Sequence, residues 1–282
     1  MFRPVVDLPG LSEAPGHWLA PDLIAWPVAM PPGQSPTALD WRLHWSNEAG
    51  IDPRASEPLP WRSCFLRFDP AGLPPEVTRG FPHLRQYLAL RVPDAAVAEL
   101  DEILRCQIVL SVHDGAGRLH AAGHLQLPGV LDQRYAAAAS AALGPTWADR
   151  RPTLRVWAPT ARRVSLLLWP GALQGAPQRL AMSPETDGTW AILGEPAWLG
   201  AKYRFEVEVY VPEHQRVVAN QVTDPYSQAL TVNSTHSVLV DLDAAELAPE
   251  QWLSARPRRL EQRVDQVIYE LHLRDFSISD DT

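Results

Sequence analysis

The sequence predicts a mainly β protein, in which an N-terminal α+β region of residues 1–150 precedes a β-sandwich of residues 151–245. Three observations predict this class. The chain has 28 prolines in 282 residues, about twice the usual frequency, and proline favours short strands and rigid turns over long helices. Short runs of alternating apolar and polar residues recur, separated by Gly and Pro. Only residues 93–106 and 135–145 have helical character.

Several strands are predicted within the first 150 residues. In residues 38–46, Trp41, Leu43 and Trp45 alternate with polar residues, which is typical of a half-buried strand. The other predicted strands are 18–26, 63–70 and the two arms of a hairpin over 107–127 that turns near Asp114 and Gly115.

The two predicted helices have different sequence signals. Residues 93–106 have Asp94 as a candidate N-cap and apolar residues at helical spacing. Residues 135–145 are rich in alanine, and Gly144 and Pro145 are expected to end that helix.

The region 151–245 contains the most regular pattern of the chain. In KYRFEVEVYVP, residues 202–212, Tyr203, Phe205 and Val207 face one way, whereas Arg204 and Glu206 face the other. Several short strands at this spacing predict a sandwich of about 95 residues. The accompanying strands are 153–159, 162–170, 189–193 and 236–242, with a turn at Asp187 and Gly188.

The last part of the chain changes character. Residues 246–266 are charged and lack a period, so a linker is predicted there. Residues 267–276, VIYELHLRDF, again predict a strand. Nothing later in the chain could supply a sheet for this strand.

Composition excludes several classes of function. A net charge of −8 argues against nucleic acid as a partner, since phosphate binding needs clustered Lys and Arg. No apolar run approaches the length of a membrane span, so no membrane partner is expected. No export signal follows Met1, and Cys64 and Cys106 are expected to be buried thiols, which together predict a cytoplasmic protein.

Local motifs define no active site. His120 and His124 are four residues apart, but they fall in a predicted strand without the glutamate of a zinc-protease helix. We therefore predict no metal, no cofactor and no catalytic residue. Most of the eleven tryptophans are expected to be core residues, although indole rings also stack on sugars.

Longer strings resemble one enzyme family. In order they are GHWLAPDLIAWP, FPHLRQYLALRVPD, GHLQLPGVLDQRY, LRVWAPTARRVSLLLW, VTDPYSQALTVNSTHSVLVDL and VIYELHLRDFS. Together they resemble the N-terminal half of pullulanase-type starch-debranching enzymes, which include bacterial pullulanases and plant limit dextrinases. WAPTA with DPYS alone would indicate only a family 48 carbohydrate-binding module, whereas FPHL through LQLPGVLD point to the pullulanase-type branch.

The resemblance implies a domain organisation. Residues 1–150 would be a pullulanase-type accessory domain, and 151–245 an immunoglobulin-like family 48 module. The linker 246–266 would lead to 267–282, the first strand of a truncated (β/α)₈ barrel of glycoside hydrolase family 13. Both catalytic carboxylates of a retaining α-1,6-glucosidase would lie on later barrel strands, and Glu270 and Asp275 are not assigned to that role.

The resemblance also implies where a glucan could bind. Some family 48 modules hold malto-oligosaccharides on tryptophans assisted by a lysine, and the counterparts here are Trp169 and Arg204. No tryptophan fills the second stacking position, where VPEHQR stands in residues 211–216. Packing of the module on the barrel is therefore favoured over direct glucan binding, which stays the alternative.

Two functions remain open at this point. The chain is expected to be the non-catalytic N-terminal half of an enzyme that hydrolyses α-1,6 bonds in pullulan, glycogen or limit dextrins. Its expected partners are α-glucan and the missing barrel of the same polypeptide. The alternative is a free-standing α-glucan-binding protein without catalytic activity.

Overall fold

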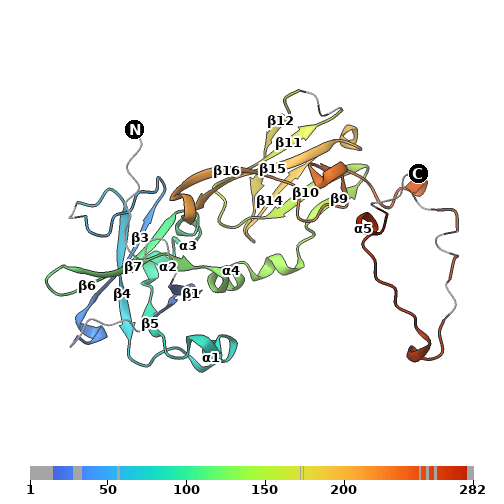
Figure 1. Ribbon diagram of the computed structural model, residues 1–282. Helices are drawn as coiled ribbons and strands as arrows, with labels where there is room; N and C mark the ends of the chain where they lie inside the picture. Colours follow the sequence, from blue (N-terminus) through green and yellow to red (C-terminus); the bar gives the residue numbers. More distant parts are fainter. Residues whose placement is uncertain are drawn as a thin grey trace. The chain divides into compact units, whose positions relative to one another are not determined.

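The computed structural model describes residues 15–27, 34–55, 58–171, 173, 175–247, 249–251, 254–256 and 259–277. The chain divides into two units, Met1–Asp241 and Leu242–Thr282. The first unit contains an accessory domain followed by a β-sandwich (Figure 1). The residues before position 15, on which the expectation about an export signal rests, lie outside the described residues. In the described residues no helix is long and apolar enough to cross a membrane.

One eight-stranded sheet forms the accessory domain, in the order β7-β6-β3-β4-β5-β2-β1-β8. All of its pairs are antiparallel except β1 with β8. The strands are β1 (Gly16–Ala20), β2 (Leu23–Trp26), β3 (Asp40–Ser46), β4 (Arg62–Asp69), β5 (Leu88–Arg91), β6 (Gln107–His113), β7 (Leu119–Gly123) and β8 (Leu125–Gln126).

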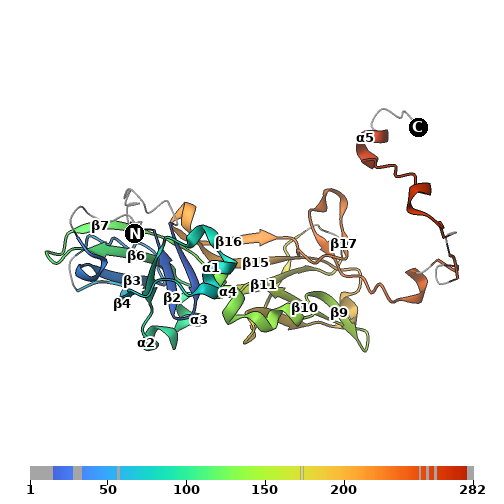
Figure 2. The same cartoon turned by 90° about the horizontal axis from the view of Figure 1, so that it is seen from below.

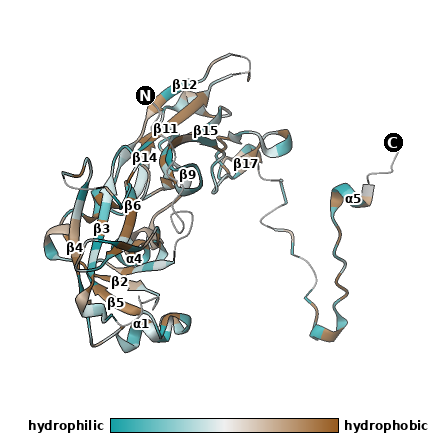
Figure 3. Cartoon of the chain, turned by 60° about the vertical axis from the view of Figure 1, so that its left-hand side comes forward, coloured by the Kyte–Doolittle hydropathy of each residue, from teal (hydrophilic) through white to brown (hydrophobic). Residues whose placement is uncertain are grey.

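The predicted strand around Trp41, Leu43 and Trp45 is confirmed as β3, and all three side chains lie in the main hydrophobic core. β3 is central, so Leu43 lies opposite Cys64 of β4 on one side and Leu110 of β6 on the other. Such a strand packs apolar residues on its core face and pairs both edges of its backbone. The strong hydrophobic colouring of β5 and β6 in Figure 3 reflects the same burial.

Both predicted helices are wrong in extent. Residues 93–106 form two short helices, α2 (Asp94–Val97) and α3 (Leu100–Ile103), because Glu99 leaves helical geometry with φ of −105° and ψ of 13°. Asp94 makes no capping bond, since Pro93 holds the N-cap position. In the accessory domain, two further helices were not predicted, α1 (Pro75–Gly80) and α4 (Pro128–Arg134).

The alanine run forms only the 3₁₀ segment η3 (Ala136–Ser140). Gly144 and Pro145 then start a strand, β9 (Gly144–Ala148), instead of ending a helix. Gly144 has a φ of +78°, which glycine adopts without strain. β9 pairs with the first long strand of the sandwich, so the sandwich begins at Gly144.

The sandwich has two sheets. One has the order β13-β14-β10-β9, and the other β12-β11-β15-β18-β17 with β16 paired to β15. Figure 2 shows β11, β15 and β16 side by side. The strands are β10 (Arg151–Trp157), β11 (Arg163–Trp169), β12 (Gln178–Ala181), β13 (Ser183–Pro184), β14 (Thr189–Leu193), β15 (Lys202–Val211), β16 (Arg216–Val222), β17 (Ala229–Leu230) and β18 (Ser237–Val238).

The core of the sandwich lies between these sheets. Tyr203, Phe205 and Val207 of β15 belong to it, as their alternation predicts. The Tyr203 hydroxyl donates a 2.7 Å hydrogen bond to Asp224 Oδ2 inside this core. Tyr203 is 0% exposed and Asp224 is 3% exposed. The fold therefore contains a buried carboxylate with a tyrosine hydroxyl as its side-chain donor.

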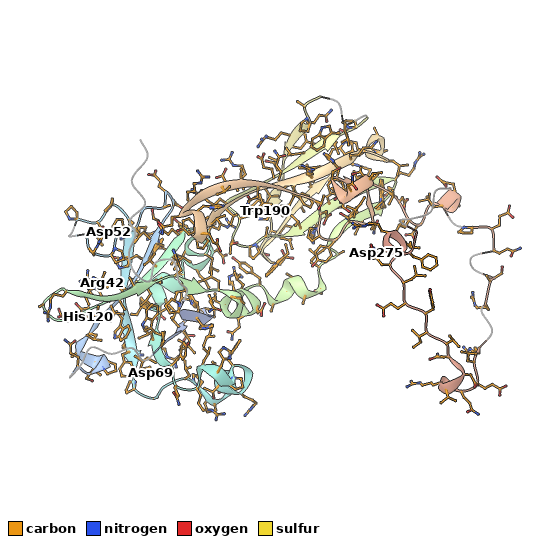
Figure 4. The ribbon with its side chains drawn as sticks, viewed as in Figure 1. Arg42, Asp52, Asp69, His120, Trp190 and Asp275 are labelled. Atoms are coloured by element: carbon orange, nitrogen blue, oxygen red, sulfur yellow. The ribbon has the colours of Figure 1, made fainter. Side chains whose placement is uncertain are left out.

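The accessory domain and the sandwich touch directly. The Arg105 guanidinium lies 5.8 Å from the centre of the Trp190 ring, which Figure 4 labels in the sandwich. The rings of His124 and Tyr210 are 5.9 Å apart. Arg162 also donates a hydrogen bond to the backbone carbonyl of Asn47.

The second unit contains little regular structure. The strand predicted over Val267–Phe276 is absent: residues 266–272 have no regular secondary structure, and α5 (Leu273–Ser277) follows. Val267 is 95% exposed and Leu273 is 79% exposed. A strand needs a neighbour for its backbone groups, and none of the described sheets includes residues 266–272.

Candidate functional site

Trp169 and Arg204 lie on the outer face of the sandwich. Trp169 is the last residue of β11, and Arg204 is the third residue of β15. The register places Trp169 opposite Lys202. Because side chains alternate along a strand, Arg204 lies on the same face as Lys202, and the core residue Tyr203 points the opposite way.

Two side chains that were not predicted complete this group. Lys202 lies opposite Trp169, and the His236 ring lies 4.7 Å from the Trp169 ring in an edge-on arrangement. Lys202 also pairs with Val238 of β18, and this pairing brings the chain just before β18 beside Arg204. We call Trp169, Lys202, Arg204 and His236 the outer-face cluster.

Backbone carbonyls orient the cluster. Trp169 Nε1 donates to the Gly175 carbonyl at 3.3 Å, and Lys202 Nζ donates to the Gly171 carbonyl at 3.2 Å. Arg204 Nε donates to the Thr235 carbonyl. The polar ends are therefore held in place while the half-buried indole stays next to solvent. A flat ring beside fixed donors suits a neutral, hydroxyl-rich ligand.

Burial, followed by the charge of Arg204, lowers the pKa of His236 from its ordinary value. The ring is therefore neutral at pH 7 and can accept as well as donate a hydrogen bond. Glu206 lies on the same face, and its carboxylate already accepts hydrogen bonds from Arg179 and from Gln221 Nε2. The arrangement is suited to binding.

The segment VPEHQR does not lie near Trp169. It forms the turn between β15 and β16, with the 3₁₀ segment η5 at Pro212–His214 and a left-handed Gln215. Lys202 and Val211 are the two ends of β15, about 30 Å apart at the usual rise of a strand. A tryptophan in this turn could not reach a ligand on the outer-face cluster.

The two histidines considered as a zinc pair point to different partners. His120 Nε2 lies 3.2 Å from Asp114 Oδ2, and His124 Nδ1 lies 2.7 Å from the Ile108 carbonyl. No group of three potential metal ligands occurs among the residues that the structure describes. In the second unit, Asp275 (labelled in Figure 4) is 68% exposed beside His272 and Arg274.

A buried chain of polar groups in the accessory domain was not predicted from the sequence. Trp61 Nε1 donates to His44 Nδ1 at 3.2 Å, and His44 Nε2 is 2.7 Å from Ser111 Oγ. His113 Nε2 extends this series of polar contacts, since it lies 3.0 Å from the Pro53 carbonyl oxygen. Burial, then His113 and Arg42, lowers the pKa of His44 to about 4. His44, Trp61 and His113 line a cavity of about 340 Å³, but the hydrogen bonds within the chain identify these groups as a structural network.

Two domain families match the chain in sequence order. Residues 13–133 match the pullulanase N2 domain, and residues 142–227 match carbohydrate-binding module 48, the isoamylase N-terminal domain. The chain is similar over most of its length to chloroplastic pullulanase 1 of Arabidopsis thaliana, at 31% identity over 94% of the chain and 27% of that relative. It is also similar to the pullulanase of Klebsiella pneumoniae, at 32% identity over 97% of the chain and 25% of that relative.

A solved structure supports the same relation. The crystal structure of apo pullulanase from Klebsiella pneumoniae matches with a TM-score of 0.77 at 31% identity, covering 87% of this chain and 26% of that one. The chain thus spans about a quarter of the length of these relatives.

Proposed function

Since the chain corresponds to the N-terminal region of pullulanase-type debranching enzymes, we propose that it serves an enzyme that hydrolyses α-1,6-glucosidic bonds in pullulan, glycogen or limit dextrins. Its own part is non-catalytic. The observation that carries this proposal is the similarity to two named pullulanases across 94% and 97% of the chain. The catalytic carboxylates would come from a barrel that follows in the same polypeptide.

The activity is tested on two proteins. The purified 282-residue chain should release no reducing sugar from pullulan, whereas the product of the gene read downstream of Thr282 should do so. Turnover by the chain alone would contradict its non-catalytic role. A stop codon directly after Thr282 would favour the alternative, a free-standing α-glucan-binding protein.

Within this function, the outer-face cluster is the proposed glucan contact. Trp169 supplies a ring for stacking, and Lys202, Arg204 and His236 surround it with polar atoms already oriented by the backbone. The carbohydrate-binding module 48 match supports α-glucan as the ligand. The competing role for the same module is packing against the barrel, without a glucan of its own.

Binding of maltoheptaose by calorimetry separates these roles. Trp169→Ala should weaken binding about tenfold, the loss expected for one aromatic stacking contact. Trp157→Ala is the matched control, because Trp157 is 36% exposed on β10 of the other sheet. Equal affinities for both variants, or no binding by the unaltered chain, would favour the packing role.

A further inference from the structure

A cavity of about 160 Å³ lies where the accessory domain meets the sandwich, away from the outer-face cluster. On the accessory side it is lined by Arg105, His124 and apolar residues such as Ile108 and Leu125. On the sandwich side it is lined by the end of β15, including Tyr210. Most of its wall is therefore apolar, and its polar side chains are Thr160 and a group of three, Arg105, His124 and Tyr210.

Each of these three side chains has a buried polar atom without a hydrogen-bond partner: Arg105 Nε, His124 Nε2 and Tyr210 Oη. All three atoms line this one cavity. Buried polar atoms are normally satisfied, because leaving one unpaired costs about 1–3 kcal/mol. Three together indicate an occupant.

The chemistry of His124 is defined by its other nitrogen. Nδ1 lies 2.7 Å from the Ile108 carbonyl, which can only accept, so Nδ1 bears the hydrogen. Burial lowers the pKa of this histidine, which is 5% exposed, and the ring is neutral. Its Nε2 is consequently a bare acceptor that requires a donor.

The other two atoms ask for different partners. Arg105 Nε–H can only donate, so it requires an acceptor. Tyr210 Oη can do both; the Gln107 amide influences its ionisation, but the two do not form a hydrogen bond of normal geometry. The occupant must therefore both donate and accept, as a hydroxyl group does. An anion that carries no hydrogen offers His124 no donor, and a cation would be repelled by Arg105.

Size narrows the choice further. A cavity of about 150 Å³ with apolar walls accommodates a benzene ring. The present cavity is of this size but has three unpaired polar atoms in its wall, which matches a ring with apolar faces and hydroxyl groups at its edge. We propose that the cavity binds one uncharged, hydroxylated six-membered ring, a single pyranose unit, at the junction of the accessory domain and the sandwich.

The test uses glucose as the probe, with inorganic phosphate in parallel. Saturation-transfer NMR should detect glucose bound to the chain, and a crystal soaked in glucose should contain one ring within hydrogen-bond distance of His124 Nε2. Tyr210→Phe should weaken binding about five- to tenfold, because only the hydroxyl is removed. Arg105→Lys, which keeps the charge but lacks Nε–H, should weaken it to a similar extent.

Trp169→Ala separates this site from the outer-face cluster. It should leave glucose in the cavity unchanged, whatever it does to maltoheptaose. The proposal is overturned if the soaked cavity contains water only, if phosphate binds there and glucose does not, or if Tyr210→Phe and Arg105→Lys bind glucose like the unaltered chain. Loss of glucose from the cavity in Trp169→Ala would equally overturn it.

Discussion

Replacing Tyr203 by Phe should destabilise the sandwich, because it removes the hydroxyl group that donates a buried hydrogen bond. The Tyr203 hydroxyl lies 2.7 Å from Asp224 Oδ2, and both residues are almost fully buried. The other carboxylate oxygen accepts from the Tyr226 backbone N–H at 2.8 Å. In the variant, Oδ2 stays inside the core without its donor.

A hydrogen bond to a charged group stabilises by about 1.5–3 kcal/mol, so the expected loss in the free energy of unfolding is about 2 kcal/mol. For a unit of this size that corresponds to a fall in melting temperature of about 4–8 °C. Urea unfolding followed by tryptophan fluorescence measures the loss. Because Phe keeps the ring, core packing is unchanged and the loss reports the hydrogen bond.

The loss should also depend on pH. Burial raises the pKa of Asp224, and the hydrogen bonds from Tyr203 and the Tyr226 backbone oppose that rise. Without the hydroxyl, the pKa of Asp224 in the folded state rises further above its unfolded value. The folded state then binds more protons, so lowering the pH through this folded pKa recovers stability. The difference between the variant and the unaltered chain is therefore largest at neutral pH and shrinks in acid.

Tyr210→Phe is the matched control for this experiment. Tyr210 lies on the same strand, β15, but its hydroxyl has no hydrogen-bond partner. In buffer without sugar, this variant should unfold within about 0.5 kcal/mol of the unaltered chain. Equal losses for the two variants, or a Tyr203→Phe loss that is the same at every pH, would refute the reasoning.

Three further predictions concern other parts of the chain. Gly144→Ala should lower the free energy of unfolding by more than about 1 kcal/mol, since φ is +78° there and an added Cβ would lie 2.8 Å from the Tyr226 carbonyl oxygen; unchanged urea unfolding would contradict this. The pKa of His44 is lowered to about 4 in the folded protein, whereas in the unfolded chain it is about 6.5. Keeping His44 neutral therefore contributes about 3 kcal/mol to the free energy of unfolding above pH 6.5, and this contribution is lost as the pH falls from about 6.5 to about 4. Urea titrations should find a smaller acid loss in His44→Gln, and equal losses would exclude His44 as the cause. Ending the chain at Asp241 should leave the melting temperature of the first unit unchanged. Leu271→Asp in the full chain should reduce aggregation, measured by light scattering, without changing the melting temperature. A melting temperature that falls by several degrees in either variant would mean that the tail belongs to the core.

The strands could be predicted where alternation is local. Residues 202–211 alternate strictly, and they form the ten-residue strand β15 with the predicted side chains in the core. β5 and β16 were not predicted. β5 is only four residues long, and most of β16 is exposed, so neither has a clear apolar alternation. Their pairing with neighbouring strands defines them.

The extent of the helices and the structure of the tail depend on tertiary contacts, which a local sequence pattern does not contain. Residues 93–106 have helical spacing, yet the chain leaves helical geometry at Glu99, although Ala96, Leu100 and Ile103 all lie in the accessory core. The apolar tail predicts a strand, but strand formation requires a partner that the described residues do not supply. The apolar pattern indicates that the segment could form a strand beside a partner, and does not indicate that it forms one alone.

The outer-face cluster was predictable in part. Lys202 has the same parity along β15 as Arg204, so the alternation could have placed it on the same face. His236 could not be found in this way. It is 34 residues beyond Lys202, and only the pairing of β18 with β15 brings it to Trp169.

One bond of the sandwich bears on how such a module is inherited. Trp147 Nε1, on the first strand β9, donates a 2.7 Å hydrogen bond to the Val240 carbonyl, just before the first unit ends. The chain therefore enters and leaves the sandwich at nearly the same point. A module whose two ends adjoin can be gained, lost or exchanged by recombination while the segments before and after it keep their spacing. The adjoining ends of residues 144–241 would therefore let this module be inserted or removed while the spacing of the flanking segments is kept.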